Sequence, residues 1–269
     1  MSGQRQDTIR RPARPSDPAR PSDHPAWACD PYADALRAGR GPLFLRRGDG
    51  WMLPLDVERW CARADEVDLQ VLERCEGAVL DVGCGPGRLV AELAARGRPV
   101  LGVDVSRAAV ARTRRLGGQA LTRSVFEPLP GEGRWDTALL LDGNLGIGGD
   151  PAALLRRLAR LLCPGGLLIA ETVPMDVDER AEVRLVSGAG SDAGAEAAFP
   201  WARLGTPALL RHARPLGWRA ADQWTAGGRS FVALRARSTN SSAEQPNSSA
   251  VISSQRPRKP LADIPVAEA

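Results

Sequence analysis

Short apolar runs alternate with helical patterns through the middle of the chain, and this alternation constrains the fold more than any other feature. The runs have strand length, and between them apolar residues recur at three- and four-residue spacings, as on one face of a helix. Strictly alternating strands and helices favour a mostly parallel sheet with both faces covered. With right-handed crossovers, the result is a three-layer α/β/α sandwich. The expected strands are 78–82, 99–103, 120–125, 135–141, 167–172, 218–224 and 229–235.

Capping residues and glycines mark the expected helices. One helix follows the first strand over residues 86–96. Ser106 can cap a second that ends before Gly117, and Asp150 followed by Pro151 begins a leucine-rich third. The Pro-Gly-Gly at 164–166 is expected to turn the chain into the next strand, and a last helix is expected at 207–216.

The two ends of the chain differ from this core in composition. Residues 1–30 repeat proline among arginine, serine and aspartate, and residues 238–269 are rich in serine with no aromatic residue. Neither composition supports a packed core, so we predict that both segments are disordered. Residues 31–77 are predicted to form a helix and hairpin cap. Residues 78–237 form the main domain, in which 181–205 is an insertion.

The segment 79–89, Val-Leu-Asp-Val-Gly-Cys-Gly-Pro-Gly-Arg-Leu, joins the first strand to the next helix. Its glycines permit positive φ angles and close approach of a ligand, and the helix N-terminus offers unpaired N–H groups. Ligands of open α/β sheets lie at the carboxyl ends of the strands, so this loop is expected to bind one. A plain glycine turn between strand and helix is the alternative.

A second acid narrows the ligand class. Asp104 ends the next strand about 20 residues later, where an acid can accept two hydrogen bonds from a ribose diol. The glycine spacing departs from the Gly-x-Gly-x-x-Gly of dinucleotide sites. Counted from Gly83, the third glycine position holds Arg88, and the frame that starts at Gly85 fails as well. Asp81, at the strand end, suits an amino group better than a pyrophosphate.

Two further motifs follow along the chain. Leu129-Pro130 precedes Trp135-Asp136 before and at the start of the fourth expected strand, and Leu-Leu-Cys-Pro-Gly-Gly at 161–166 precedes the fifth. Together with the glycine loop and Asp104, they make residues 78–173 similar to the class I S-adenosylmethionine-dependent methyltransferases, especially the small-molecule "type 11" domains. The resemblance implies S-adenosylmethionine as the cofactor. The expected fold is a Rossmann-like sandwich around a mostly parallel seven-stranded sheet with an antiparallel closing strand.

The resemblance also implies roles for individual residues. The loop from Gly83 to Gly87 holds the methionine moiety, with Asp81 near its amino group. Asp104 binds the ribose hydroxyls, and Val105 lies against adenine. The predicted cofactor-binding residues are Asp81, Gly83, Cys84, Gly85, Gly87, Asp104, Val105, Ser124, Val125 and Asp142.

Two segments depart from the family pattern. Ser124-Val125 stands where members often carry an acid near the adenine amine, so a hydroxyl or backbone contact is expected there. Segment 142–150 lacks the Asn/Asp-Pro-Pro-aromatic motif of the nucleic-acid and amine-modifying members, which argues against methylation of a base or amide nitrogen by that loop. Asp142 or Asn144 could orient the acceptor. A flexible loop that ends in the Asp150 helix cap is the alternative.

Catalysis needs little from the side chains. Methyl transfer is an in-line displacement, and a general base is required only if the nucleophile starts protonated and weakly acidic. We therefore assign no firm catalytic residue, and neither His24 nor His212 is expected to act. The acceptor pocket is expected between the hairpin 42–55 and the insertion 181–205. Its candidate aromatic residues are Tyr32, Trp51, Trp60 and Trp201.

Composition limits compartment and partners. The 36 basic and 32 acidic residues give a net charge of +4, and the arginines are interleaved with acids, which argues against nucleic-acid binding. The five cysteines show no metal-ligand spacing, so we expect reduced thiols in the cytoplasm and no metal. No apolar run has the length of a membrane span or the form of a signal peptide. The oligomeric state is not predicted.

The predicted function is methylation of a small-molecule acceptor. Three alternatives remain open on the sequence: methylation of a protein or RNA, a nicotinamide-dependent oxidoreductase, and a catalytically silent nucleotide-binding module. The acceptor atom is not predicted.

Overall fold

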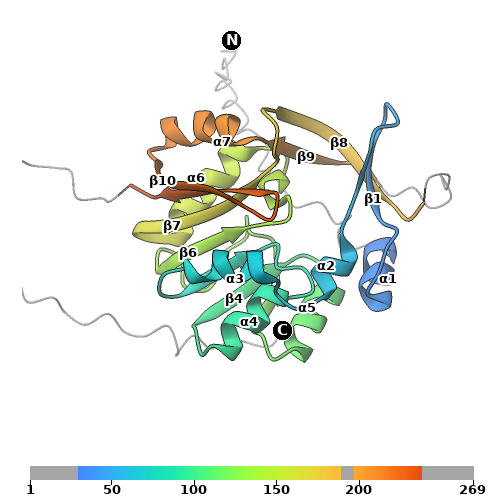
Figure 1. Cartoon of the computed structure of the whole chain (residues 1–269), viewed down its shortest axis with the longest axis horizontal. Coiled ribbons are helices and arrows are strands. Elements are labelled where there is room, and N and C mark those ends of the chain that lie inside the picture. Colours follow the sequence, from blue (N-terminus) through green and yellow to red (C-terminus); the bar gives the residue numbers. More distant parts are fainter. Residues whose placement is uncertain (1–29, 189–196, 238–269) are drawn as a thin grey trace, which may run out of the picture.

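A seven-stranded sheet forms the centre of the computed structural model, which describes residues 30–188 and 197–237 (Figure 1). The strand order is β10-β11-β7-β6-β3-β4-β5. Strands β5, β4, β3, β6 and β7 are parallel, and β11 is antiparallel to both β7 and β10. The predicted fold class is confirmed. The strands are β3 (Val79–Val82), β4 (Val100–Asp104), β5 (Ala120–Thr122), β6 (Trp135–Leu140), β7 (Leu162–Thr172), β10 (Arg219–Ala226) and β11 (Arg229–Arg235).

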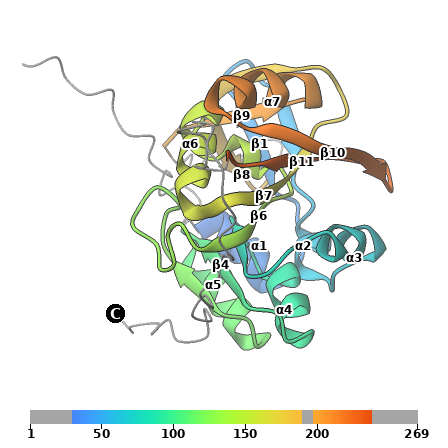
Figure 2. The ribbon, with the colours of Figure 1, turned by 90° about the vertical axis from the view of Figure 1, so that its left-hand side faces the viewer.

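Helices cover both faces of this sheet, as Figures 1 and 2 show. The pattern along β6 explains why both faces are apolar. Leu139 belongs to the cluster formed with α3 and α4, whereas Leu140 belongs to the cluster formed with α6 and α7. The helices are α3 (Glu66–Glu73), α4 (Arg88–Ala95) and α5 (Arg107–Arg115) on one side, and α6 (Pro151–Leu161) and α7 (Thr206–Ala213), which continues into η3 (Arg214–Leu216), on the other.

The predicted helix caps are present. Ser106 accepts a hydrogen bond from the Ala109 amide, and the Asp150 carboxylate accepts from the amides of Ala152 and Ala153. The helix after the glycine loop begins at Arg88, two residues later than predicted, because Gly87 has a left-handed backbone conformation that a helix interior does not allow.

Two strands have a bound that differs from the prediction by three residues or more. Strand β5 ends at Thr122 instead of residue 125, because the Ser124 hydroxyl accepts a hydrogen bond from the Phe126 amide and bends the chain. Strand β7 begins at Leu162 instead of residue 167. The register against β6 then jumps to Leu167, so the Pro-Gly-Gly lies inside an irregular strand.

A second, four-stranded antiparallel sheet lies beside the central one, at the right of Figure 1. The predicted hairpin supplies two strands, and the other two pair with it. Segment 181–205 is therefore different from the simple insertion we expected, because strand pairing begins at Asp178 and unites the segment with the cap. The sheet order is β2 (Met52–Pro54), β1 (Phe44–Arg47), β8 (Asp178–Val186) and β9 (Phe199–Leu204).

Two short helices complete the cap. Helix α1 (Asp30–Ala38) and helix α2 (Val57–Cys61) pack with the inner face of the second sheet. Because α1 begins at Asp30, the predicted arm 1–30 is one residue too long. The rest of that arm and the tail 238–269 lie outside the described residues.

Candidate active site

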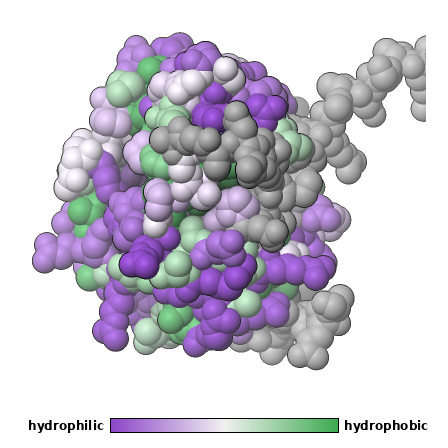
Figure 3. Space-filling view, turned by 90° about the vertical axis from the view of Figure 1, so that its right-hand side faces the viewer, coloured by the Kyte–Doolittle hydropathy of each residue, from purple (hydrophilic) through white to green (hydrophobic). Residues whose placement is uncertain are grey.

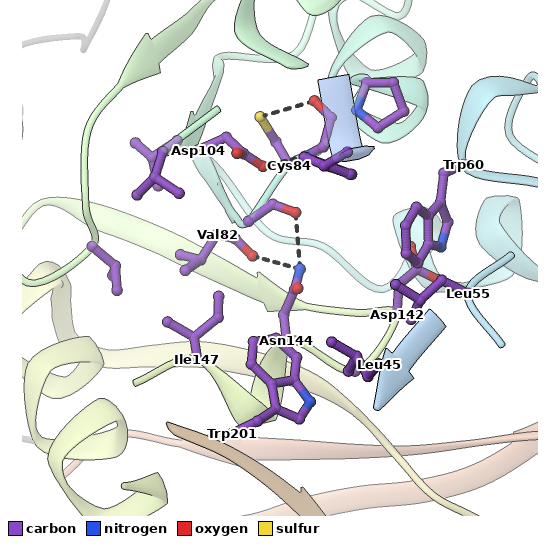
Figure 4. Close-up of a pocket in the computed structure, with 18 of the residues that line it drawn as sticks. Leu45, Leu55, Trp60, Val82, Cys84, Asp104, Asp142, Asn144, Ile147 and Trp201 are labelled. Carbon is purple, nitrogen blue, oxygen red and sulfur yellow. Dashed lines mark hydrogen bonds between the residues drawn. The ribbon is translucent and has the colours of Figure 1, made fainter. Parts of the chain in front are cut away.

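A cavity lies at the carboxyl ends of β3, β4 and β6, between the central sheet and the cap (Figure 4). The central sheet contributes its polar lining, and the cap and second sheet contribute mainly apolar side chains. Apolar walls with a few polar groups are typical of sites for small molecules and cofactors. The predicted cofactor-binding residues that line it are Gly83, Cys84, Gly85, Asp104, Val105, Val125 and Asp142.

The glycine loop has a backbone that only glycine adopts readily. Gly83 and Gly85 have φ angles of 71° and 53°. The amide nitrogen of Asn144 donates to the carbonyl oxygens of Val82 and Gly83, both at 2.9 Å, so a Cβ on Gly83 would collide with the Asn144 side chain. Asn144, in the segment after β6, therefore holds the glycine loop in place through these two hydrogen bonds.

Gly87 does not line the cavity. A Cβ at this position would lie 2.4 Å from the Thr113 hydroxyl, so Gly87 is needed for packing against α5. The cofactor contact of Gly87 stays a prediction, and the position where its Cβ would stand faces α5 and not the cavity.

Asp104 braces the glycine loop from the next strand. One carboxylate oxygen accepts from the Gly85 amide at 2.8 Å, and the other accepts from the Ser106 amide at 2.8 Å. Each carboxylate oxygen has a second lone pair for a further donor. Asp104 therefore links the end of β4 to the glycine loop and to the start of α5.

Asp81 lies beneath the loop and does not line the cavity. Its Oδ2 is buried and has no hydrogen-bond partner within the described part of the chain. Burial raises the pKa of Asp81 to about 7. Arg88 opposes the shift, and the carboxylates of Asp142 and Asp104 add to it. A buried acceptor of this kind is suited to a cationic or N–H ligand group.

Asp142 is held by arginines. Its two carboxylate oxygens bond to Arg59 Nη2 and Arg88 Nη1, each at 2.6 Å. Burial alone raises the pKa of Asp142, but the guanidinium groups of Arg88 and Arg59 outweigh burial and lower it. Asp142 also has a φ of 56°. An ionised, doubly paired carboxylate is a poor general base, so the geometry favours an orienting role for Asp142.

The ion pairs extend below the cavity floor. Arg88, with a side chain only 5% exposed, also pairs with Asp68 at 2.7 Å. Arg229 joins Asp68 and Glu171, each at 2.8 Å. The network connects α3, α4, β7 and β11 with the loop after β6. Sequence reasoning missed it; the one available signal was Arg88, a charged residue directly after the glycine loop.

The expected hydroxyl contact at Ser124 finds no support. Ser124 does not line the cavity, and its Oγ accepts a hydrogen bond from the Phe126 amide. Val125 lines the cavity, but its carbonyl oxygen accepts from the buried Nε of Arg157 at 2.7 Å. Arg157 therefore positions this loop, which no local sequence pattern indicates.

The aromatic lining is largely as predicted. Tyr32, Trp60 and Trp201 line the cavity. Trp51 does not, because its ring lies between two guanidinium groups, 5.0 Å from that of Arg47 and 4.9 Å from that of Arg203. The prediction for Trp51 is therefore wrong.

Neither histidine enters the site as the structure describes it. His212 bonds to Asp178 at 3.0 Å and is not a cavity residue. His24 lies outside the described residues.

Comparison with known proteins decides the family. The model of the methyltransferase domain family matches residues 58–214, more than half of the chain. The chain belongs to this family. A solved structure of an S-adenosylmethionine-dependent methyltransferase from Bacteroides fragilis, in complex with S-adenosylhomocysteine, has a TM-score of 0.64 at 20% identity. The match covers 82% of this chain and 98% of that one. The predicted family and fold are confirmed.

The methyltransferase also resembles ubiquinone biosynthesis O-methyltransferases. The protein of Pseudomonas paraeruginosa (strain DSM 24068 / PA7) is 36% identical over 104 residues, which cover 35% of this chain and 44% of that one. The protein of Caulobacter sp. (strain K31) is 27% identical over 217 residues, 74% of this chain and 82% of that one. The chain therefore spans less than half the length of the first of these relatives.

Two features are absent from the described residues. No helix there has the length and apolar character to cross a membrane. No group of three or more His, Cys, Asp or Glu side chains there is arranged to hold a metal ion.

Proposed function

We propose that this methyltransferase transfers a methyl group from S-adenosylmethionine to a small-molecule acceptor by in-line displacement. One observation carries the proposal: the glycine loop and Asp104 line the same cavity as the apolar wall of the cap and second sheet. The ligand of the Bacteroides fragilis neighbour and the names of the O-methyltransferase relatives support the same activity.

The residues present fit the cofactor. Six buried side-chain atoms have no hydrogen-bond partner in the described part of the chain, and two of them belong to residues of opposite charge: the acceptor Asp81 Oδ2 and the donor Arg59 Nη1. They match the ammonium and the carboxylate of a methionine moiety, in sign and in hydrogen-bonding role. Asp104 suits the ribose hydroxyls, and Val105 and Val125 offer apolar surface to adenine.

Bound S-adenosylmethionine supplies an electrophilic methyl group on a sulfonium. The protein contributes binding, orientation and exclusion of water. The glycine loop and Asp104 fix one end of the cavity, and the wall that includes Trp201 holds the acceptor at the other. Holding the nucleophile in line with the methyl carbon contributes much of the acceleration. Asp142, ionised and paired, orients groups and does not remove a proton.

Calorimetry tests the proposal directly. S-adenosylmethionine and S-adenosylhomocysteine are expected to bind the full chain with one site each, and NAD is expected to give no heat of binding under the same conditions. Binding of NAD in preference to both would overturn the proposal in favour of an oxidoreductase. A matching test of turnover uses mixtures of small-molecule, peptide and RNA acceptors with radiolabelled methyl donor. Transfer confined to peptide or RNA contradicts a small-molecule acceptor.

A further inference from the structure

We infer that the acceptor is a neutral, mainly apolar ring compound that carries a hydroxyl of phenolic or enolic type. The inference rests on the proposed function and names the substrate class of the same cavity. Three observations carry it: the composition of the acceptor wall, the confinement of the charged lining residues of the described chain to the side of the central sheet, and the polar groups that face the acceptor.

The acceptor wall is apolar and broad. It comes from the second sheet, the cap and the loop after β6, and Figure 4 shows these side chains on the side of the cavity away from Asp104. Two of its members are flat indole rings, which favour a planar ring as ligand. The wall consists of Leu45, Leu53, Leu55, Trp60, Ile147 and Trp201.

Apolar surface of this size is scarce on the outside of the molecule. Within the described residues, Leu116 and Met175 are the exposed large apolar side chains. Figure 3 shows hydrophobic residues on one face as small areas scattered among hydrophilic ones. The apolar surface available for ligand recognition is therefore inside the cavity.

The charged residues of the lining lie on the side of the central sheet. Arg88 and Asp142 bond to each other, and Arg123 donates to the Pro128 carbonyl oxygen at 2.9 Å. Asp104, at the end of β4, bonds to the glycine loop. The acceptor wall itself contributes no charged side chain within the described residues. A carboxylate, phosphate or ammonium against this wall loses its hydration without an ionic partner, so the cavity selects neutral acceptors.

One polar atom faces the acceptor from the floor. The Asn144 amide nitrogen donates to two loop carbonyl oxygens, which leaves Oδ1 as the hydrogen-bond acceptor of this side chain. An amide oxygen accepts from an O–H or N–H. Asn144 therefore positions an acceptor that carries a proton on its nucleophilic atom.

Among the described residues, the one lining carboxylate besides Asp142 is Asp104, which accepts from the Gly85 and Ser106 amides at the cofactor end, away from the acceptor wall. The other lining groups there offer no base near neutral pH. Burial raises the pKa values of the Tyr32 hydroxyl and the Cys84 thiol, so both stay protonated. Burial raises the pKa of Asp142, but Arg88 and Arg59 lower it by more. Asp142 therefore stays ionised and is a weak base. Asp81, with a pKa of about 7, lies outside the lining. The acceptor must release its own proton.

The acceptor must therefore enter the cavity neutral and still lose its proton without a base, and the classes of nucleophile differ in this respect. An aliphatic amine is a cation at neutral pH, which the wall disfavours, and an aliphatic alcohol ionises far too rarely. A phenol, with a pKa of about 10, enters neutral and still ionises to roughly one part in a thousand at pH 7. The oxygen–carbon bond then forms as the carbon–sulfur bond breaks, the electron pair of that bond goes to sulfur, and the phenolic proton leaves to solvent.

Three probes of one ring size test the inference: 2-naphthol, 2-naphthoate and 2-naphthylmethylammonium. Each is titrated by calorimetry into the full chain saturated with S-adenosylhomocysteine. We expect the naphthol to bind at least tenfold more tightly than either ion. Equal or tighter binding of an ion, or no binding of any probe, overturns the inference. The saturation step separates the two proposals, because failure of S-adenosylhomocysteine to bind removes the proposed function itself.

Variants locate the binding to the wall. Trp201→Ala is expected to weaken naphthol binding about tenfold, whereas Trp51→Ala, directly before β2 and outside the cavity, leaves it within twofold. Leu53→Arg, at a half-buried position of the wall, is expected to shift the preference toward 2-naphthoate by tenfold or more. Unchanged preferences in both Leu53→Arg and a folded Trp201→Ala contradict the assignment of the wall.

Discussion

The Asp104 side chain has one structural role and one role in the proposed function. Its carboxylate holds the Gly85 and Ser106 amides, and in the proposed function it also binds the ribose diol. Hydrogen bonds to a charged group contribute about 1.5–3 kcal/mol each. Asp104→Ala is therefore expected to lower the affinity for S-adenosylmethionine by about 10- to 1,000-fold, and Asp104→Asn by less, since each 1.4 kcal/mol is tenfold. Calorimetry measures both.

S-adenosylhomocysteine is expected to lose affinity for Asp104→Ala in parallel, because it presents the same ribose. Asp222→Ala, on the exposed strand β10, is the control and leaves both affinities unchanged. Affinities within twofold of the wild type in a folded Asp104→Ala protein rule out the ribose contact.

Asp81 is expected to lower stability at high pH. Its pKa in the folded protein is about 7 against an ordinary 3.8, so the folded state retains the proton longer than the unfolded chain. Stability from this group is present below about pH 4 and is lost as the pH rises to 7. Asp81→Asn removes the charge. We compare the free energy of unfolding of this variant with that of the wild type at each pH. The gain of the variant over the wild type is expected to be about 2–3 kcal/mol larger at pH 8 than at pH 5.

Urea unfolding of both proteins at the two pH values measures this difference. In the proposed function, Asp81→Asn also weakens S-adenosylmethionine binding, because the amide cannot pair with an ammonium as a carboxylate does. A stability gain that is the same at pH 5 and pH 8 contradicts the raised pKa.

At this scale, the sequence predicted residues whose role is local. Gly83, Gly85 and Asp104 lie where the strand-loop-helix pattern places them. Their bonding partners come from distant segments. Arg59 and Arg88 meet at Asp142, which is 83 positions from the first and 54 from the second, and no spacing rule connects them. Trp51 was misassigned for the same reason, since Arg203 reaches it from another strand.

Among the elements, η2 (Asn144–Gly146) and β9 make the contact that joins the central sheet to the second sheet. A Cβ on Gly146 would lie 2.3 Å from the Trp201 ring and 2.5 Å from the Ala202 carbonyl oxygen. Because the φ of Gly146 is outside the positive range, alanine tests packing alone. Overpacking costs about 1–3 kcal/mol, so Gly146→Ala is expected to lower the thermal midpoint and weaken naphthol binding.

The affinity of Gly146→Ala for S-adenosylhomocysteine should stay within a few-fold of the wild type, because the glycine loop is on the other side of the cavity. Gly48→Ala is the matched control, since a Cβ there meets no atom within 4 Å and its φ is ordinary. A Gly146→Ala protein with unchanged stability and unchanged naphthol binding shows that the contact is dispensable.

The elements of the central sheet were predictable because their signals are local. Alternating apolar runs, the Ser106 and Asp150 caps and the glycine turns all act within a few residues. The second sheet was predicted only as a hairpin and an insertion. Its pairing joins Leu45 to Leu185, and strand pairing between such distant segments leaves no periodic signal in either one.

For the molecule as a whole, the composition of the two ends predicts that they contribute little to stability. A shortened chain of residues 27–237 is expected to keep its thermal midpoint within a few degrees, since segments poor in apolar residues bury little surface. Scanning calorimetry of the full and shortened chains checks this. A fall of the midpoint beyond a few degrees, or loss of solubility, shows that an end packs on the domain.

The pairing of β1 with β8 also sets an order of events during synthesis. The two strands are separated in the chain by the whole parallel core, so the N-terminal hairpin leaves the ribosome long before its partner exists. Closing so long a loop is entropically unfavourable until the core has shortened the distance. A nascent chain can thus complete the glycine loop while the acceptor wall is still half built. The part of the cavity that binds the methyl donor therefore forms before the wall that selects the acceptor. Because this wall forms last, its residues are the ones that mutation can replace with least disturbance to the core.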